Sequence, residues 1–213
     1  MENMMAVDVT NSEFSQVYTL TSAFEHVLNE ALANATRQTN HGKAIDDFQV
    51  HCERIAYRTT EFRAVQALVK DVERQAQSGQ DTRMTNRVAL AYTATALHNF
   101  WSDIHANLAD YGFSASFVAQ LLGDADVMRA MREGMAERVF RSIGQDVLEA
   151  DGVNNAWLGD ELSELTRHTV RDFTRQEIEP IAERLHRQDE LAPDDLIEKM
   201  GDLGFFAMSI PEA

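Results

Sequence analysis

The stretch Ile45–Ala76, IDDFQVHCERIAYRTTEFRAVQALVKDVERQA, decides the fold of this chain. Its apolar and small residues return every three or four positions, which is the spacing of one face of an α-helix. The members of this stripe are Ile45, Phe48, Cys52, Ile55, Thr59, Phe62, Val65, Val69, Val72 and Ala76. So long a stripe predicts a helix that packs along a partner helix, in a bundle or across a dimer.

Comparable stripes lie on both sides of this segment. Helices are predicted over about 12–41, 45–78, 82–111, 114–122 and 124–147. The chain holds three prolines, all from Pro180 onward, and shows no long alternation of apolar and polar residues. In the last of these helices Met128, Met131 and Met135 share the buried stripe. The sequence therefore predicts an all-α protein that begins with an antiparallel bundle of four long helices.

The charge of the chain excludes several classes of partner. A formal net charge of −16 argues against nucleic acid, whose phosphates require clustered Lys and Arg, and against anionic membranes. Cys52 is the single cysteine, so no internal disulfide is expected, and its place on the stripe favours an inert core residue. Neither a secretory signal nor a membrane-spanning apolar run is visible, which predicts a cytoplasmic protein.

The character of the sequence changes after the bundle. Asp151-Gly152, Asn154-Asn155 and Gly159 are residues typical of turns. We place a domain boundary here, with residues 1–155 before it as a helical extension and residues 156–213 after it as a second domain.

The final segment is predicted to form a pair of helices, with residues that favour helix starts and ends at their boundaries. Asp160 is suited to cap a helix with Leu162, Leu165, Thr169 and Phe173 on its buried face. The next apolar position is Ile178, a step of five, and Pro180 predicts a kink or a meeting of two helices there. Pro193 heads another helix, whose buried face is Leu196, Ile197, Met200 and Leu203. Gly204 is expected to end it, and Phe205–Ile210 to be extended.

This segment resembles the opening of the acyl-CoA dehydrogenase family. The resemblance rests on Phe173-x-x-x-Glu177-Ile178-x-Pro180, an acidic stretch, Pro193, Leu203-Gly204-Phe205 and Ile210-Pro211-Glu212, in that order and spacing. It covers about the last quarter of the chain, which we expect to be interrupted within that domain, just before a Tyr-Gly-Gly motif of the family.

The resemblance implies an enzyme that binds FAD and removes two hydrogens across the α,β bond of an acyl-CoA thioester, with a glutamate base. In such an enzyme the flavin site and the glutamate lie in later domains. We therefore assign no catalytic, cofactor-binding or metal-binding residue here, and we expect the 213-residue chain to be inactive and to bind no FAD. Its exposed face should lie on Leu196, Met200, Phe205 and Phe206, where the enzyme's remaining domains would pack.

About 150 residues precede the matching segment, which ordinary members of the family lack. A subgroup with such an extension oxidises methylsuccinyl-CoA, a branched dicarboxylic thioester, to mesaconyl-CoA. We expect the extension to pack on the dehydrogenase body or to enlarge the interface of a homo-oligomer. The alternatives are a module that binds an electron-transfer partner or a regulator, and a free-standing helical interaction protein outside any enzyme.

Two other groups of polar residues suggest chemistry only weakly. His98 and His105 lie seven positions apart, too far for two ligands of one metal on a helix, so solvated or hydrogen-bonded histidines are expected. Glu177, Glu179 and Glu183 alternate with arginines, which favours a solvated, ion-paired face.

Overall fold

The computed structural model describes residues 12–152 and 158–207, and none of these residues forms a strand. The all-α prediction is therefore confirmed. Contacts within the chain divide it into two compact units, Met1–Asn154 and Asn155–Ala213, which we name the bundle unit and the tail unit. The predicted boundary turn at Asn154-Asn155 and the motif Ile210-Pro211-Glu212 lie outside the described residues.

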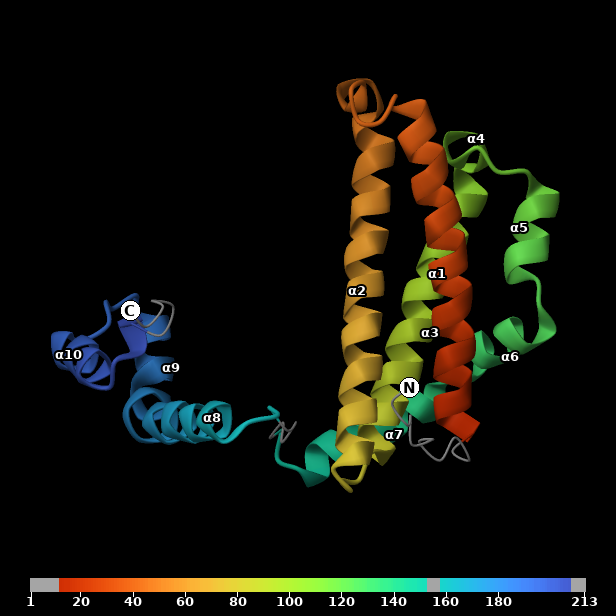
Figure 1. Ribbon diagram of the computed structural model, residues 1–213. Helices are drawn as coiled ribbons and strands as arrows, with labels where there is room; N and C mark the ends of the chain where they lie inside the picture. The colour runs from red at the N-terminus through yellow and green to blue at the C-terminus, as the bar shows by residue number, and fades with distance from the viewer. Residues whose placement is uncertain (1–11, 153–157, 208–213) are drawn as a thin grey trace, which may run out of the picture. The chain divides into compact units, whose positions relative to one another are not determined.

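Three long helices run side by side, up, down and up, in the bundle unit (Figure 1). They are α1 (Ser12–Gln38), α2 (Gln49–Gln77) and α3 (Arg83–Ala106). Phe24 of α1 packs against Phe62 of α2, a member of the predicted stripe, and against Phe100 of α3, with ring centroids 5.2 and 5.6 Å away. Phe24 and Phe100 are fully buried, so the middle of the bundle is closed to water.

The second helix starts later than its stripe indicates. Ile45–Phe48 form a 3₁₀ turn, η1, ahead of α2, and both Ile45 and Phe48 are exposed. The connection before it contains three successive residues with positive φ, Asn40, His41 and Gly42, so the chain turns sharply after α1. This turn leaves the first two positions of the stripe beyond the reach of the core. Cys52, expected inside, is only half-buried.

The third predicted helix ends early, and its last stripe residues belong to a separate helix. α3 stops at Ala106, and α4 (Leu108–Tyr111) follows with Gly112 in the left-handed region behind it. The break lies at Asn107, whose side-chain amide donates to the Asp103 backbone carbonyl and carboxylate instead of pointing to solvent. Tyr111 is nevertheless fully buried.

The prediction of a fourth long helix is wrong. The short helix α5 (Ala115–Leu122) forms as expected, but α6 (Ala125–Gly134) and α7 (Glu137–Glu149) then replace one continuous helix. A Cβ on Gly134 would lie 2.6 Å from Ala94 Cβ and 2.8 Å from the Leu90 carbonyl oxygen, so α6 crosses α3 at very short range. Directly after this crossing Ala136 is extended, and the chain turns into α7.

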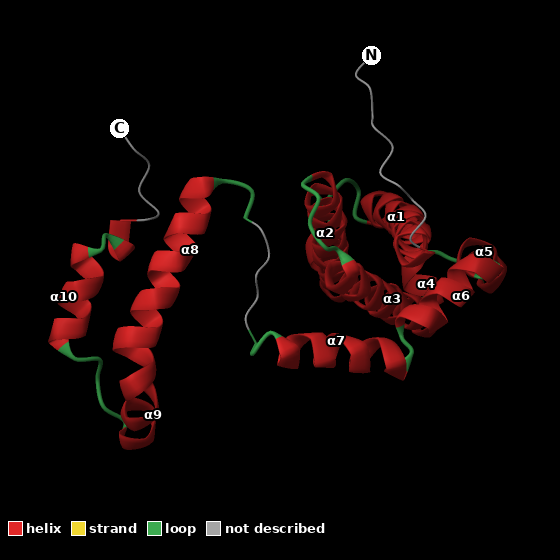
Figure 2. Ribbon diagram, turned by 90° about the horizontal axis from the view of Figure 1, so that it is seen from below, coloured by secondary structure: helices red, strands yellow, loops and turns green. Residues whose placement is uncertain are grey.

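α7 packs beside α3, near the end of the bundle where α3 begins (Figure 1 and Figure 2). Val139 is its buried contact, and Arg87 of α3 pairs with Asp146 at 2.9 Å. Phe140, Val147 and Leu148 of α7 are exposed. The fourth layer of the bundle is thus short, and α6 rather than α7 packs between α1 and α3.

The tail unit is a nearly continuous helix with a second helix turned back beside it (Figure 2). The elements are α8 (Glu161–Phe173), η2 (Thr174–Ile178), α9 (Glu179–Gln188), α10 (Asp194–Asp202) and η3 (Phe205–Ala207). The predicted cap is confirmed, because Asp160 Oδ1 accepts the Ser163 N–H at 2.8 Å. Hydrogen bonding to the backbone also lowers the pKa of the Asp160 carboxyl.

The step of five from Phe173 to Ile178 is a π-helical turn. In η2 the Glu179 N–H donates to the Thr174 carbonyl, five residues back, so the helix widens by one residue just before Pro180. This turn accommodates the proline, which lacks an N–H, without separating α8 from α9. The predicted kink thus takes the form of a change in helix register.

The buried faces predicted for the tail unit form only in part. On α10 Leu196 is buried, whereas Ile197 and Leu203 are exposed. On α8 Phe173 is buried against Phe205, while Leu162 and Leu165 are 73% and 64% exposed. Phe205–Ala207 form a 3₁₀ turn rather than the extended segment that was predicted, because Gly204 with φ +74° folds the chain back toward Phe173. The exposed face expected on Leu196, Met200, Phe205 and Phe206 is therefore wrong in part: Phe206 is exposed, Met200 and Phe205 are half-buried, and Leu196 is buried.

Candidate functional site

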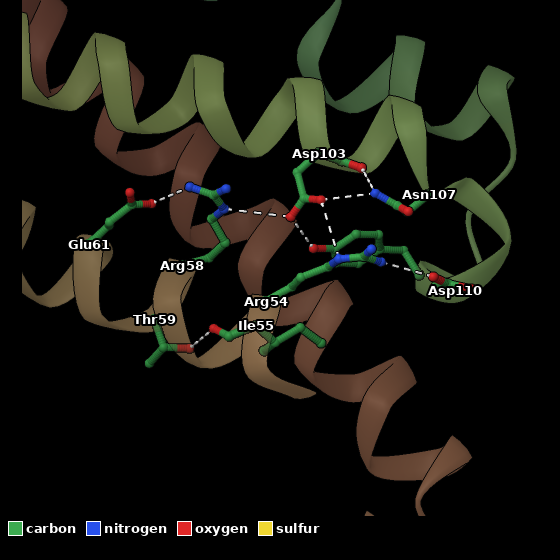
Figure 3. Close-up of polar contacts among 9 residues, drawn as sticks. Arg54, Ile55, Arg58, Thr59, Glu61, Asp103, Asn107 and Asp110 are labelled. Atoms are coloured by element: carbon green, nitrogen blue, oxygen red, sulfur yellow. Dashed lines mark hydrogen bonds and ion pairs between the residues drawn. The ribbon is translucent and has the colours of Figure 1, made fainter. Parts of the chain in front are cut away.

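The densest polar site surrounds the carboxylate of Asp103, where α2, α3 and α4 meet (Figure 3). Asn107 Nδ2 donates to Asp103 Oδ1 at 3.0 Å. From α2, Arg54 Nε lies 3.9 Å from Asp103 Oδ1, and Arg58 Nε lies 3.7 Å from Asp103 Oδ2. The Asp103 side chain is 14% exposed, so this charge is held largely away from water. The two arginines lie one helical turn apart, which presents both to α3.

Tyr111 of α4 also belongs to this cluster. Its hydroxyl donates to Asp103 Oδ2 at 2.8 Å, and the whole residue is buried. Burial raises the pKa of the Tyr111 phenol, and the hydrogen bond to Asp103 and the charge of that carboxylate raise it further. Tyr111 therefore stays protonated and acts as a hydrogen-bond donor, not as a base.

His51 lies against this cluster without joining it. Its ring meets that of Tyr111 edge to face at 4.9 Å, it is 5% exposed, and neither ring nitrogen has a hydrogen-bond partner. Burial lowers the pKa of His51, and the charge of Arg54 lowers it further, although Asp110 and Asp103 act in the opposite direction. The neutral imidazole is the form that this site accepts.

A groove of about 680 Å³ lies between α1 and α2, on another face of the bundle unit. The hydroxyls of Thr36, Thr39 and Thr59, which line it, all donate to carbonyls of their own helices. Cys52 also lines the groove. The remaining lining residues are Leu32, Ala35, His41, Gly42, Ile55 and Ala56, so the lining contains neither Lys nor Arg.

The tail unit has its own polar contacts beside the π-helical turn. Glu177 of η2 pairs with Lys199 of α10, an interaction that the sequence did not indicate. Glu183 pairs with Arg187 at 2.7 Å, as expected of an ion-paired helix face. A second groove follows α8, with Leu158, Leu162 and Val170 beside Arg167 and Arg171.

The histidines weighed as metal ligands lie apart from the Asp103 cluster. The rings of His98 and His105 both lie against Trp101, at 5.8 and 4.4 Å, and His105 Nδ1 contacts the Trp101 carbonyl. Within residues 12–152 and 158–207, His, Cys, Asp and Glu side chains form no group of three that could hold a metal ion. In the same residues no helix is long and apolar enough to cross a membrane.

Comparison with known families matches both units. A model described as the C-terminal domain of acyl-CoA dehydrogenase matches residues 5–148, and one described as the N-terminal domain matches residues 160–213. The first match covers more than half of the chain, and the chain belongs to the acyl-CoA dehydrogenase family. The resemblance of the tail unit is thereby borne out. The likeness of residues 5–148 to the family's C-terminal domain was not foreseen, and this domain precedes the N-terminal one here.

Individual relatives match a stretch of 52 residues of the chain. The chain is 44% identical over 52 residues to the mitochondrial short-chain specific acyl-CoA dehydrogenase of Mus musculus. It is 42% identical over 52 residues to the 3-(aryl)acrylate reductase of Clostridium sporogenes. These stretches are 24% of this chain but 12% and 14% of the two relatives. The chain therefore spans a small part of the curated relatives that it matches.

Members of the family use FAD, and two places in the bundle unit are candidates to hold it, the α1–α2 groove and the Asp103 cluster. The pyrophosphate of FAD needs cations or free N–H groups at its site. The lining of the α1–α2 groove contains neither Lys nor Arg, and its threonine hydroxyls already donate to backbone carbonyls of the chain. At the Asp103 cluster Arg54 and Arg58 are held by carboxylates of the chain. Neither place fits the cofactor.

Proposed function

We propose that this chain serves in an FAD-dependent acyl-CoA dehydrogenase, with residues 160–213 as the first helices of the enzyme's N-terminal helical domain. The observation that carries the proposal is the match of residues 160–213 to the N-terminal domain of acyl-CoA dehydrogenase, on a segment that folds as α8, η2, α9 and α10. Acyl-CoA dehydrogenases are oxidoreductases that act on CH–CH bonds, and oligomers are typical of the family.

The reaction requires a base close to the substrate α carbon and donors to the thioester carbonyl, which acidify the α proton. FAD, where bound, supplies the acceptor for the hydride from the β carbon. We propose that the described residues of this chain act as scaffold: Phe173, Leu196 and Phe205 hold α8 and α10 together. Catalytic, cofactor-binding and metal-binding roles are assigned to none of them, and the isolated 213-residue chain is expected to be inactive.

For the substrate we propose methylsuccinyl-CoA, with mesaconyl-CoA as product. The proposal is supported by the helical unit of about 150 residues ahead of the N-terminal domain, which resembles the extension of that subgroup. The names of the relatives supply two competing substrates, a short-chain acyl-CoA and a 3-(aryl)acrylate. The composition supports action in the cytoplasm.

A substrate panel tests this proposal. The whole protein, purified from the cells that make it, would be assayed with methylsuccinyl-CoA, a short straight-chain acyl-CoA and an arylpropionyl-CoA, with a chemical electron acceptor. We expect a flavin absorbance and the highest kcat/KM with methylsuccinyl-CoA. A flavin-containing enzyme that prefers another thioester would refute the substrate alone. A protein without flavin or activity would refute the enzymatic proposal.

For the bundle unit we propose a structural role, either packing on the dehydrogenase body or enlarging an oligomer interface. A free-standing interaction module is the second candidate, favoured by the exposed apolar residues Phe140, Val147 and Leu148 on α7. Light scattering on the 213-residue chain and on a Phe140→Ser, Leu148→Ser variant separates them. An oligomeric wild-type chain together with a monomeric double variant supports the oligomer interface. A strictly monomeric wild-type chain counts against it.

A further inference from the structure

Four donor groups converge on the single carboxylate of Asp103. The Tyr111 hydroxyl and the Asn107 amide donate to it at 2.8 and 3.0 Å. The guanidinium groups of Arg54 and Arg58 lie next to the two oxygens of the same carboxylate. Two arginines with neutral donors are the set that proteins use to bind phosphate and carboxylate anions. Here the bound anion is the carboxylate of Asp103, a residue of the chain itself.

The carboxylate of Asp103 does not accept hydrogen bonds from all four of these donor groups. The two arginine Nε atoms lie 3.9 and 3.7 Å from the oxygens of Asp103, which is beyond hydrogen-bond length. Arg58 Nε is buried and has no hydrogen-bond acceptor. A tetrahedral phosphate has four oxygens where the carboxylate has two, so it can accept from both arginines as well as from Tyr111 and Asn107.

We infer that Asp103 occupies, from within the chain, an anion site built by Arg54, Arg58, Asn107 and Tyr111, and that it thereby closes the bundle unit to phosphate-bearing ligands such as FAD. Two further carboxylates keep the arginines in place: Asp110 pairs with Arg54 at 3.0 Å, and Glu61 pairs with Arg58 at 2.7 Å. Removal of Asp103 alone therefore leaves a positioned, cationic cavity at the α2–α3–α4 junction.

The test is rescue by an added anion. The 213-residue chain and its Asp103→Ala variant are melted at pH 7.5 in sodium phosphate and in sodium chloride of equal ionic strength. We expect phosphate to raise the wild-type melting temperature only by the small, general amount that a kosmotropic anion gives. The variant should melt lower in chloride and recover in phosphate, by on the order of 4 °C at a phosphate concentration tenfold above its dissociation constant. Pyrophosphate should act at lower concentration.

Asp146→Ala is the matched control, because it also removes a carboxylate that pairs with one arginine, Arg87, at 2.9 Å. It should lose stability without any gain specific to phosphate. Asp103→Ser, which keeps a small polar side chain, is measured in parallel. If Asp103→Ala does not fold in chloride, circular dichroism in the two salts gives the same comparison.

Equal melting of both Asp103 variants in phosphate and chloride would overturn the inference, as would an equal phosphate gain in Asp146→Ala. So would FAD binding by the wild-type chain that Arg54→Gln abolishes. Each of these outcomes is independent of the proposed enzymatic activity, because a flavin site elsewhere in the whole protein would leave them unchanged.

Discussion

The bundle unit and the tail unit differ in how they cover their apolar side chains. In the bundle unit α1, α2 and α3 enclose aromatic and aliphatic residues with almost no exposure, such as Phe24, Leu97 and Phe100. In the described part of the tail unit, Phe173 and Leu196 are the buried apolar residues, while Leu162 and Leu165 face water. The bundle unit has a core of its own, and the tail unit has an apolar surface that suits contact with further protein.

The largest expected effect is the loss of an aromatic side chain from the bundle core. Phe24→Ala removes a fully buried ring that contacts Phe62 and Phe100, and it should lower the free energy of unfolding of the bundle unit by about 3–5 kcal/mol. Urea unfolding followed by circular dichroism measures the change. Phe206→Ala, on a 59% exposed ring of the tail unit, is the control and should change little. Equal losses in both variants would remove the contrast between the units.

The next effect concerns the crossing of α6 over α3. Gly134→Ala places a methyl group against Ala94 and the Leu90 backbone, so one helix must shift, and we expect a loss of about 1–3 kcal/mol. Gly144→Ala on α7 is the control, because a Cβ there meets nothing within 4 Å. It should be neutral or stabilising, since alanine favours helix over glycine. A neutral Gly134→Ala would mean that α6 does not cross α3 so closely.

A smaller effect depends on pH and on His51. The pKa of His51 is lowered from 6.5 in the folded chain, so between the two values the unfolded chain binds more protons. Stability is therefore complete above about pH 6.5 and falls as the pH falls below it, by at most about 1.4 kcal/mol per pH unit. Urea unfolding between pH 7.5 and 5.5 should show this slope in the wild-type chain and a reduced slope in His51→Leu.

The control for this titration is Leu148→Gln, which changes an exposed side chain of α7 that binds no proton. It should keep the wild-type slope. Identical slopes in His51→Leu and wild type would show that His51 titrates normally, and that its ring is hydrated despite its burial.

Helix periodicity predicted the bundle helices because it reports which residues of a helix face the core. The later apolar positions of the α2 stripe and the cap at Asp160 are local features that the structure bears out, whereas Ile45, Phe48 and Cys52 lie outside the core. The break between α6 and α7 has another cause, the short distance between Gly134 and α3, and the apolar pattern continues across it. Nothing local to 128–147 distinguishes these residues from a single helix.

The Asp103 cluster escaped prediction for a related reason. Arg54 and Asp103 lie on different helices, and only the folded bundle brings them together. An arginine pair at positions 54 and 58 beside the buried stripe was the available signal, although such pairs are common on solvated helix faces. The similarity of residues 5–148 to the family's C-terminal domain was not predicted either. It rests on the pattern of amphipathic helices and not on a short motif.

The smallest predicted effect sharpens the contrast between the units most directly. Leu165→Gln replaces a 64% exposed side chain of α8, and it should change the stability of the isolated chain by less than about 0.5 kcal/mol. Hydrogen exchange of the α8 amides measures this, with Phe173→Ala, a buried ring on the same helix, as the control that should raise exchange. The same Leu165→Gln change in the whole protein should lower the free energy of unfolding by more. Burial of this apolar side chain contributes stability only where other domains cover it. Equal and small effects in both settings would mean that this face of α8 stays in water, and the tail unit would then be complete without a covering domain.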